Sequence, residues 1–213
     1  MEISRKLASN LLQIKAIKIN AQNLFVWASG IHSPIYCDNR LALSYPNVRE
    51  MIIHGFVELS KKFDNIDYIA GVATAGIPWG ALLADRLQLP FVYIRSNAKS
   101  HGRQNKIEGE LKTDKNVLVI EDLISTGGSS LQAVEAIREN DNKVLAVLAI
   151  FSYNLKKAEI NFKEAECDFL SISNYDILIE EAKKQKYISS GEFQIIKEWK
   201  TDPENWFKNL KYE

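Results

Sequence analysis

Residues 117–130 constrain the fold more than any other stretch of the sequence. They begin with an apolar run, continue with two carboxylates and a loop of hydroxyls and glycines, and end in a helical pattern. Residues 117–120 are four consecutive apolar residues, which is typical of a strand buried on both faces of a sheet. Glu121 and Asp122 stand where that strand is expected to end, and residues 125–129 read Ser-Thr-Gly-Gly-Ser. A buried strand that leads through such a loop into a helix predicts an α/β fold.

The loop at residues 125–129 is suited to bind a phosphate group. Glycines let the backbone approach a ligand closely, and the first turn of a helix offers unpaired N–H groups and partial positive charge. The loop lacks the Gly-Lys-Ser/Thr ending of triphosphate-binding loops and the Gly-x-Gly-x-x-Gly of dinucleotide-binding folds.

The acidic pair before the loop narrows the choice of ligand. Glu121 and Asp122 would repel a phosphate unless they bind something else, and a pair of sugar hydroxyls is the simplest partner. The stretch therefore predicts a site for a ribose 5-phosphate, with the phosphate in the loop and the 2- and 3-hydroxyls on the carboxylates. The alternative is a solvated acidic strand end followed by an ordinary helix cap.

Composition argues against several other classes of function. Lys+Arg and Asp+Glu each number 27, so the formal net charge is zero, which gives no support to a nucleic-acid or membrane-surface role. No apolar run approaches the roughly 18 residues that span a bilayer. Cys37 and Cys167 have neither metal-ligand nor disulfide-framework spacing, and residues 1–6 begin no apolar leader. We therefore expect a reduced, cytoplasmic setting.

Helical and strand patterns alternate along the chain. We expect helices at residues 2–18, 46–64, 77–88, 128–140, 155–166 and 174–187 and after Ser189, and strands at 68–73, 91–94, 117–120 and 144–151. Strands that alternate with helices predict a central, mainly parallel sheet flanked by helices. No repeat or linker divides the sequence, so residues 1–213 are expected to form a single domain.

Four blocks of the sequence resemble the type I phosphoribosyltransferases, which transfer a ribose 5-phosphate from 5-phosphoribosyl 1-pyrophosphate (PRPP) to a nitrogen base. They are FVWASGIHSPIYCDNR at 25–40, IAGVATAGIP at 69–78, YIRSNAKSHG at 93–102 and the stretch at 117–130. The first and third are typical of the branch that uses orotate. The resemblance implies the type I phosphoribosyltransferase fold with a small hood built from about residues 1–40 and part of the C-terminal region. It also implies transfer to orotate, which forms orotidine 5-phosphate and pyrophosphate in de novo pyrimidine (UMP) biosynthesis.

The resemblance also implies roles for individual residues. Those implied to bind PRPP are Thr74, Ala75, Gly76, Arg95, Lys99, His101, Glu121, Asp122, Ser125, Thr126, Gly127, Gly128 and Ser129. Those implied to bind orotate are Tyr36, Arg40 and Ser125. Lys99, His101 and Asp122 are expected to be catalytic. The expected cofactor is Mg²⁺, which would bridge the pyrophosphate and ribose hydroxyls of PRPP without direct ligands from protein side chains.

Residues 95–110 are predicted to form a mobile basic lid. They hold Arg95, Lys99 and His101 among other polar residues, and Ile107 is almost their only apolar side chain, so they cannot bury enough surface to hold themselves in place. Cations that close over a departing pyrophosphate would stabilise its charge and exclude water. The resemblance implies a homodimer in which this loop reaches the partner's active site. The alternative is an ordinary solvated loop.

The chain departs from the family pattern at Ala28, Ala75 and Ser96, where some relatives carry lysine, so the site is expected to be less cationic than theirs. Two alternatives remain. One is a phosphoribosyltransferase for a purine or another base, against which the block at 25–40 argues. The other is a non-catalytic PRPP-sensing regulator on the same fold, against which the zero net charge and the complete basic loop argue.

Overall fold

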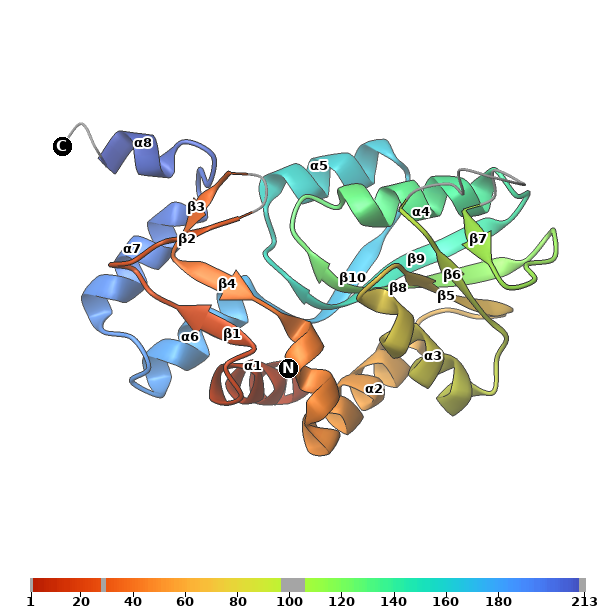
Figure 1. Cartoon of the computed structure of the whole chain (residues 1–213), viewed down its shortest axis with the longest axis horizontal. Coiled ribbons are helices and arrows are strands. Elements are labelled where there is room, and N and C mark those ends of the chain that lie inside the picture. The colour runs from red at the N-terminus through yellow and green to blue at the C-terminus, as the bar shows by residue number, and fades with distance from the viewer. Residues whose placement is uncertain (1, 28–29, 97–105, 211–213) are drawn as a thin grey trace.

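The computed structural model describes residues 2–27, 30–96 and 106–210, and its main feature is a six-stranded sheet (Figure 1). The strand order is β10-β9-β8-β5-β6-β7. In chain order the strands are β5 Tyr68–Val72, β6 Phe91–Ile94, β7 Ile107–Glu108, β8 Asn116–Ile124, β9 Lys143–Ser152 and β10 Phe169–Asn174. All neighbours are parallel except β6 and β7, so the predicted mainly parallel sheet is confirmed.

Helices cover both faces of this sheet (Figure 1). On one face lie α2 Pro46–Ser60 and α3 Gly76–Leu87, and on the other lie α4 Gly128–Arg138 and α5 Lys156–Glu164. Strand β8 shows why a continuous apolar run suits this position. Leu118 and Ile120 pack into the core on the α2 and α3 side, whereas Val117 and Val119 pack into the core on the α4 and α5 side. Successive side chains of a strand point to opposite faces, so both faces must be apolar here.

A layer of short elements, which we call the hood, stands at the carboxyl end of the parallel strands, on the left of Figure 1. Its members are β1 Ile17–Ile19, β2 Phe25–Val26, β3 His32–Ser33, β4 Ile35–Cys37, α6 Tyr175–Lys184, α7 Ser190–Trp199 and α8 Trp206–Leu210. N-terminal and C-terminal parts of the chain therefore lie side by side. The ring of Trp27 links them, at 4.7 Å from that of Tyr153 and 5.5 Å from that of Trp199.

Two short helices connect the hood to the sheet. Helix α1 Glu2–Gln13 contacts α6, α2 and β10, and the 3-10 helix η1 Asn39–Ser44 leads from β4 into α2. Pro46 opens α2 as predicted. The capping box at the start of α7 is also confirmed, because the Ser189 hydroxyl accepts from the N–H of Glu192 and the Glu192 carboxylate accepts from the N–H of Ser189. In the described part of the chain no helix is long and apolar enough to cross a membrane.

Element boundaries differ from the sequence prediction in several places, of which three bear on the site or the sheet. The first helix ends at Gln13, and Ile17 already belongs to β1. Strand β10, at the edge of the sheet, lies in a stretch for which no element is predicted, although its serines alternate with apolar residues as in a half-buried strand. Strand β8 continues to Ile124, so Glu121 and Asp122 lie within the strand rather than after it.

Gly71 on β5 lies so close to the start of α3 that a side chain does not fit. An added Cβ would stand 2.9 Å from the carbonyl oxygen of Gly76 and 3.0 Å from the Cα of Ile77. Because both are backbone atoms, the helix would have to shift. We expect Gly71→Ala to lower the free energy of unfolding by about 1–3 kcal/mol in urea denaturation.

A matched control is Gly191→Ala in α7, where an added Cβ meets nothing within 4 Å. This variant should keep the wild-type free energy of unfolding or raise it by up to about 1 kcal/mol. Equal stabilities of the two alanine variants would contradict the close approach of β5 and α3.

Candidate active site

The carboxyl ends of β5 and β8 lie where the order of the sheet reverses. Strand β5 pairs with β6 on one side and with β8 on the other, and the helices that follow β5 and β8 cover opposite faces. Such a reversal opens a crevice outside the carboxyl ends of the strands, which is the usual ligand site of open parallel sheets. The loops at residues 73–75 and 125–127 follow directly from the carboxyl ends of β5 and β8, where such a crevice is expected.

Glu121 is buried, and both of its carboxylate oxygens accept hydrogen bonds from the protein. Its Oε1 accepts from the N–H of Asp122 at 3.0 Å, and its Oε2 accepts from the hydroxyls of Ser129 at 3.1 Å and Ser130 at 3.3 Å. These serines belong to the first turn of α4, so the carboxyl group ties the end of β8 to the start of that helix. Burial, with the negative charge of Asp122 as a second cause, raises the pKa of Glu121 to about 8.

Asp122 is the more accessible member of the acidic pair. It is partly buried, whereas only 4% of Glu121 is exposed. Burial raises the pKa of Asp122, while its hydrogen bond with Glu121 and the positive charge of Arg40 act in the opposite direction. Since the oxygens of Glu121 already have partners, Asp122 is the carboxylate that a ligand can reach.

The loop after β8 is shaped by two glycines in different ways. Gly127 has a φ of +84° and caps α4, and an added Cβ there would lie 2.5 Å from the ring of Phe162. An added Cβ on Gly128 would meet nothing within 4 Å, so the first residue of α4 borders open space. The carbonyl of Thr126 accepts from the side-chain amide of Asn161 on α5 at 2.9 Å. This loop therefore holds the unpaired N–H groups of a helix start at the crevice, which suits a phosphate.

The predicted pyrophosphate loop lies directly beside the end of β8. Thr74 is exposed, the peptide bond between Ala73 and Thr74 is cis, and Ala75 is the N-cap of α3. A Cβ added to Gly76 would collide with the carbonyl oxygen of Ile120. The backbone of the loop at 74–76 therefore packs against the backbone of β8 next to the acidic pair.

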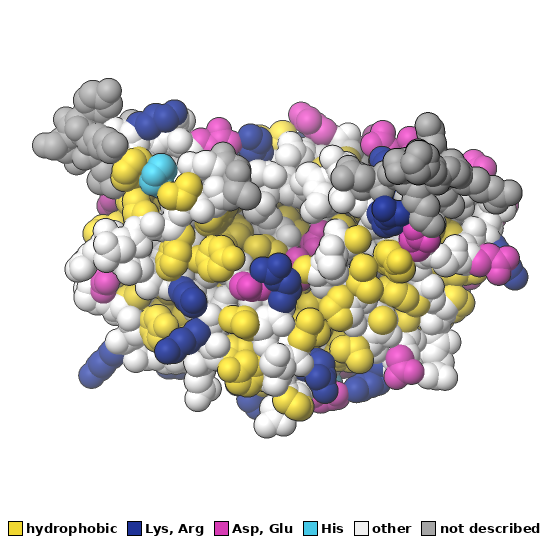
Figure 2. Space-filling model, viewed as in Figure 1, with side chains coloured by type: hydrophobic (Ala, Val, Ile, Leu, Met, Phe, Trp, Pro, Cys, Tyr) yellow, Lys and Arg dark blue, Asp and Glu magenta, His cyan; other side chains and the backbone are white. Residues whose placement is uncertain are grey.

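Tyr36 on β4 of the hood and Arg40 on η1 come from the N-terminal part of the chain, and the charge of Arg40 acts on Asp122. Two donors of the Arg40 guanidinium bind Asp38, with Nε 2.6 Å from Oδ1 and Nη2 2.9 Å from Oδ2. These hydrogen bonds hold the pKa of Asp38 below its usual value. Tyr36 is 38% exposed, and its ring lies 5.7 Å from that of Phe25. In Figure 2 basic and acidic side chains stand next to each other near the middle of the view, between the hood and the sheet.

The predicted lid at 95–110 is too long at its C-terminal end, because Ile107 and Glu108 form β7, pair with β6 and bury the side chain of Ile107. Of the other lid residues the structure describes 95–96, 106 and 109–110. Arg95 follows β6, its N–H donates to the carbonyl of Lys106 at 2.9 Å, and its Nη1 lies 3.3 Å from Oε1 of Glu108. Lys99 and His101 lie outside the described residues. The structure therefore brings together the loops at 74–76 and 125–129, the acidic pair, Tyr36 and Arg40, and leaves the roles of the lid residues as predictions.

Side chains without a predicted role support the site. Ser130 helps to bind Glu121, Asn161 holds the carbonyl of Thr126, and Asn39 donates to the carbonyl oxygen of Asp122 at 2.8 Å. The position of Asn39 inside the block at 25–40 is a local signal that could have pointed to it. Asn161 carries no such signal, because it lies 35 residues from its partner.

Comparison with known proteins identifies relatives over nearly the whole chain. The phosphoribosyl transferase domain family matches residues 44–182. The chain is 49% identical over 97% of its length to an orotate phosphoribosyltransferase of Streptococcus agalactiae, of which 99% is covered. It is 48% identical over 98% of its length to the orotate phosphoribosyltransferase of Listeria monocytogenes, which is covered completely (100%).

Solved structures show the same fold. Orotate phosphoribosyltransferase from Aeropyrum pernix has a TM-score of 0.74 and 26% identity, with 86% of this chain and 99% of that chain covered. The UMP synthase of Leishmania donovani has a TM-score of 0.81 and 24% identity, with 93% of this chain and 42% of that chain covered, and this likeness bears on the fold alone. The fold expected from the four sequence blocks is confirmed.

The raised pKa of Glu121 makes stability depend on pH. In the folded protein this carboxyl group keeps its proton up to about pH 8, whereas in the unfolded chain it ionises near its ordinary pKa of 4.5. The folded state therefore binds more protons between these values. The stabilisation present below about pH 4.5 is lost as the pH rises to about 8, by up to about 1.4 kcal/mol per pH unit.

Glu121→Gln keeps the shape of the side chain and cannot ionise, so the pH-dependent loss of stability should be absent from this variant. Relative to the wild type, the variant should gain free energy of unfolding between about pH 5 and about pH 8, measured by urea denaturation at both values. A difference between the two proteins that stays constant with pH would show that Glu121 does not carry this proton.

Proposed function

Because the chain belongs to the phosphoribosyl transferase family and, within it, to the orotate phosphoribosyltransferases, we propose that the crevice at β5 and β8 transfers the phosphoribosyl group of PRPP to N1 of orotate. The products are orotidine 5-phosphate and pyrophosphate, in a step of de novo pyrimidine biosynthesis. The observation that carries this proposal is the placement of an accessible carboxylate, Asp122, between two loops suited to bind phosphate groups.

The site matches the order of groups along PRPP. The 5-phosphate would bind the N–H groups of residues 125–129, the ribose hydroxyls would bind Asp122, and the pyrophosphate would bind the loop at 74–76. Glu121 would keep the phosphate loop in place through Ser129 and Ser130. The transfer needs no protein nucleophile, since holding the two reactants in line and stabilising the departing pyrophosphate lower the barrier.

The base would bind against the hood. The exposed part of the Tyr36 ring offers a flat apolar surface for a pyrimidine. Arg40 has donors beyond the two bound to Asp38, and its charge suits the carboxylate of orotate. Ser125 directly follows β8 and is the first residue of the phosphate loop.

Mg²⁺ is part of the proposal. This ion prefers oxygen ligands and keeps several of its own waters, so pyrophosphate and ribose oxygens of PRPP suit it, with Asp122 as the nearest protein carboxylate. Among residues 2–27, 30–96 and 106–210 no group of three or more His, Cys, Asp or Glu side chains could hold a metal alone. An ion that arrives with PRPP would, when bound, neutralise charge on the pyrophosphate.

A homodimer in the cytoplasm completes the proposal. Leu41, Tyr45 and Leu82 are large apolar side chains that remain exposed on η1, at its end and on α3. Figure 2 shows hydrophobic side chains gathered over the region of α3, and such patches are typical of protein interfaces. Lys99 and His101 would serve the partner's site. Both cysteines are buried and free, as suits a reducing compartment.

Spectrophotometric assay of orotate with PRPP and Mg²⁺, beside adenine, hypoxanthine and guanine as rival bases, tests the activity. We expect PRPP-dependent loss of orotate and no turnover of the purines.

Asp122→Asn should lower kcat/KM for PRPP by about 10²-fold without lowering the melting temperature. Asp64→Asn, an exposed carboxylate in the turn after α2, is the matched control and should keep wild-type activity. Turnover of a purine in place of orotate, or an unimpaired Asp122→Asn protein, would overturn the proposal.

Mixing two impaired proteins tests the shared site. Lys99→Ala should lose about 10²–10³ in rate, because its charge would meet the departing pyrophosphate. If Lys99 serves the neighbouring subunit, hybrids of Lys99→Ala with Asp122→Asn have one site with both wild-type residues. Activity should therefore reappear on mixing. No recovery, although mass spectrometry shows that subunits exchange, would contradict a site shared between subunits.

A further inference from the structure

Asn39 is a buried amide between the hood and β8. It is the first residue of η1, and its exposed fraction is 0%. Its Nδ2 donates to the backbone carbonyl oxygen of Asp122 at 2.8 Å, and its Oδ1 accepts from the Sγ of Cys37 at 3.3 Å. Each end of the amide has its own partner, and the bond to Asp122 joins positions 83 residues apart.

The carbonyl of Asp122 needs a donor because β8 is longer than its neighbour β5. Pairing between these strands ends where Ile120 faces Gly71, whereas pairing with β9 continues to Ile124. Past Ile120 the backbone of β8 has no β5 residue beside it. A buried backbone acceptor is costly without a partner, and the amide of Asn39 supplies one where the strand cannot.

The carbonyl of Asp122 can only accept, so the donating Nδ2 of Asn39 must face it, and the thiol of Cys37 is a compatible partner for Oδ1. A thiol that keeps its proton donates, and burial raises the pKa of Cys37 well above its ordinary value, with the charges of Asp122 and Asp38 as further causes. Oδ1 of Asn39 therefore faces the thiol and Nδ2 faces β8.

Buried and exposed residues are interspersed in the segment 36–40. Cys37 and Asn39 are buried, whereas Tyr36 and Arg40 are exposed. The buried residues fix the segment to β8, and the exposed ones are those proposed to bind the base. One hydrogen bond thus connects the backbone that carries Arg40 to the backbone that carries Asp122.

We propose that Asn39 is a positioning residue that holds the ribose-binding carboxylate of Asp122 in register with the base-binding segment at 36–40. The inference rests on the proposed function. Transfer requires the anomeric carbon of PRPP and the nitrogen of the base to meet in line, and a small misplacement of one against the other slows the reaction steeply. Each substrate keeps its own contacts when this bond is lost, so turnover suffers more than binding.

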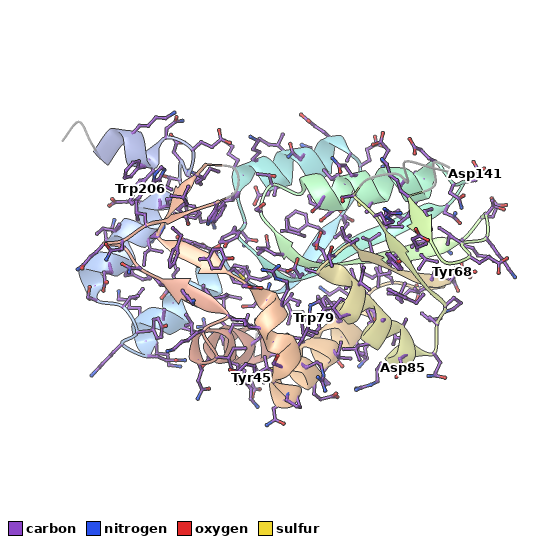
Figure 3. All side chains as sticks on the ribbon, viewed as in Figure 1. Tyr45, Tyr68, Trp79, Asp85, Asp141 and Trp206 are labelled. Atoms are coloured by element: carbon purple, nitrogen blue, oxygen red, sulfur yellow. The ribbon has the colours of Figure 1, made fainter. Side chains whose placement is uncertain are left out.

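Asn39→Ala and a matched control, Asn142→Ala, separate positioning from stability. Asn142 is also a buried asparagine with a bond at each end, since its Oδ1 accepts from the N–H of Lys115 at 2.9 Å and its Nδ2 donates to the carbonyl of Asn140 at 2.6 Å. It follows Asp141, which Figure 3 shows at the end of the molecule far from Trp206 of the hood. Both variants should therefore lose stability to a similar degree.

The kinetic effect should be confined to Asn39→Ala. We expect its kcat, with orotate and PRPP both saturating, to fall about 10²-fold while the KM of each substrate changes little. Asn142→Ala should keep the wild-type kcat. Asn39→Asp keeps the shape of the side chain but replaces the donating Nδ2 with an oxygen, so its kcat should also fall. This variant provides the test if Asn39→Ala does not fold.

Wild-type kcat in a folded Asn39→Ala protein, or an equal loss of kcat in Asn39→Ala and Asn142→Ala, would overturn the inference. If Asn39→Ala does not fold, wild-type kcat in Asn39→Asp would do the same. A wild-type protein that does not convert orotate and PRPP would instead overturn the proposed function, on which the inference rests. The assay of the unmodified protein therefore comes first and distinguishes the two failures.

Discussion

A carboxyl group removed from water at the end of β8 sets the arrangement of the site. Glu121 can remain buried because the N–H of Asp122 and the hydroxyls of Ser129 and Ser130 donate to it. The same bonds fix the first turn of α4 against the strand. The N–H groups of that turn are thereby held beside Asp122 before a ligand arrives, and donors fixed in advance stabilise charge without reorganising.

Close backbone packing then brings the second loop to the same place. Gly76 touches the carbonyl of Ile120, and Gly71 leaves room for the start of α3, so the loop at 74–76 lies against the end of β8. On the opposite side, the side-chain amide of Asn39, which follows the hood strand β4, donates a hydrogen bond to the carbonyl of Asp122. The acidic pair thus has the proposed phosphate loop, a second loop and the proposed base-binding segment as neighbours, which suits a reaction that depends on placing two substrates.

Local sequence predicts the elements of this site better than their junctions. The buried strand, the start of α2 at Pro46 and the capping box at Ser189 follow from short-range patterns and are confirmed. The predicted loop at 125–129 is shorter in the structure, because Gly128 and Ser129 already belong to α4. The extension of β8 over the acidic pair could not be predicted, because charged residues ordinarily mark the end of a buried strand. Contacts of Asn39 and Asn161 with β8 and its loop span 83 and 35 residues, and no local pattern records them.

A crystal structure of the protein with PRPP and Mg²⁺ tests the central claim most directly. Our account predicts the 5-phosphate within hydrogen-bonding distance of the N–H groups at the start of α4 and the ribose hydroxyls on the carboxylate of Asp122. Glu121 should remain bonded to Ser130 beneath them. A phosphate bound away from α4, or a ribose without contact to Asp122, would contradict the account.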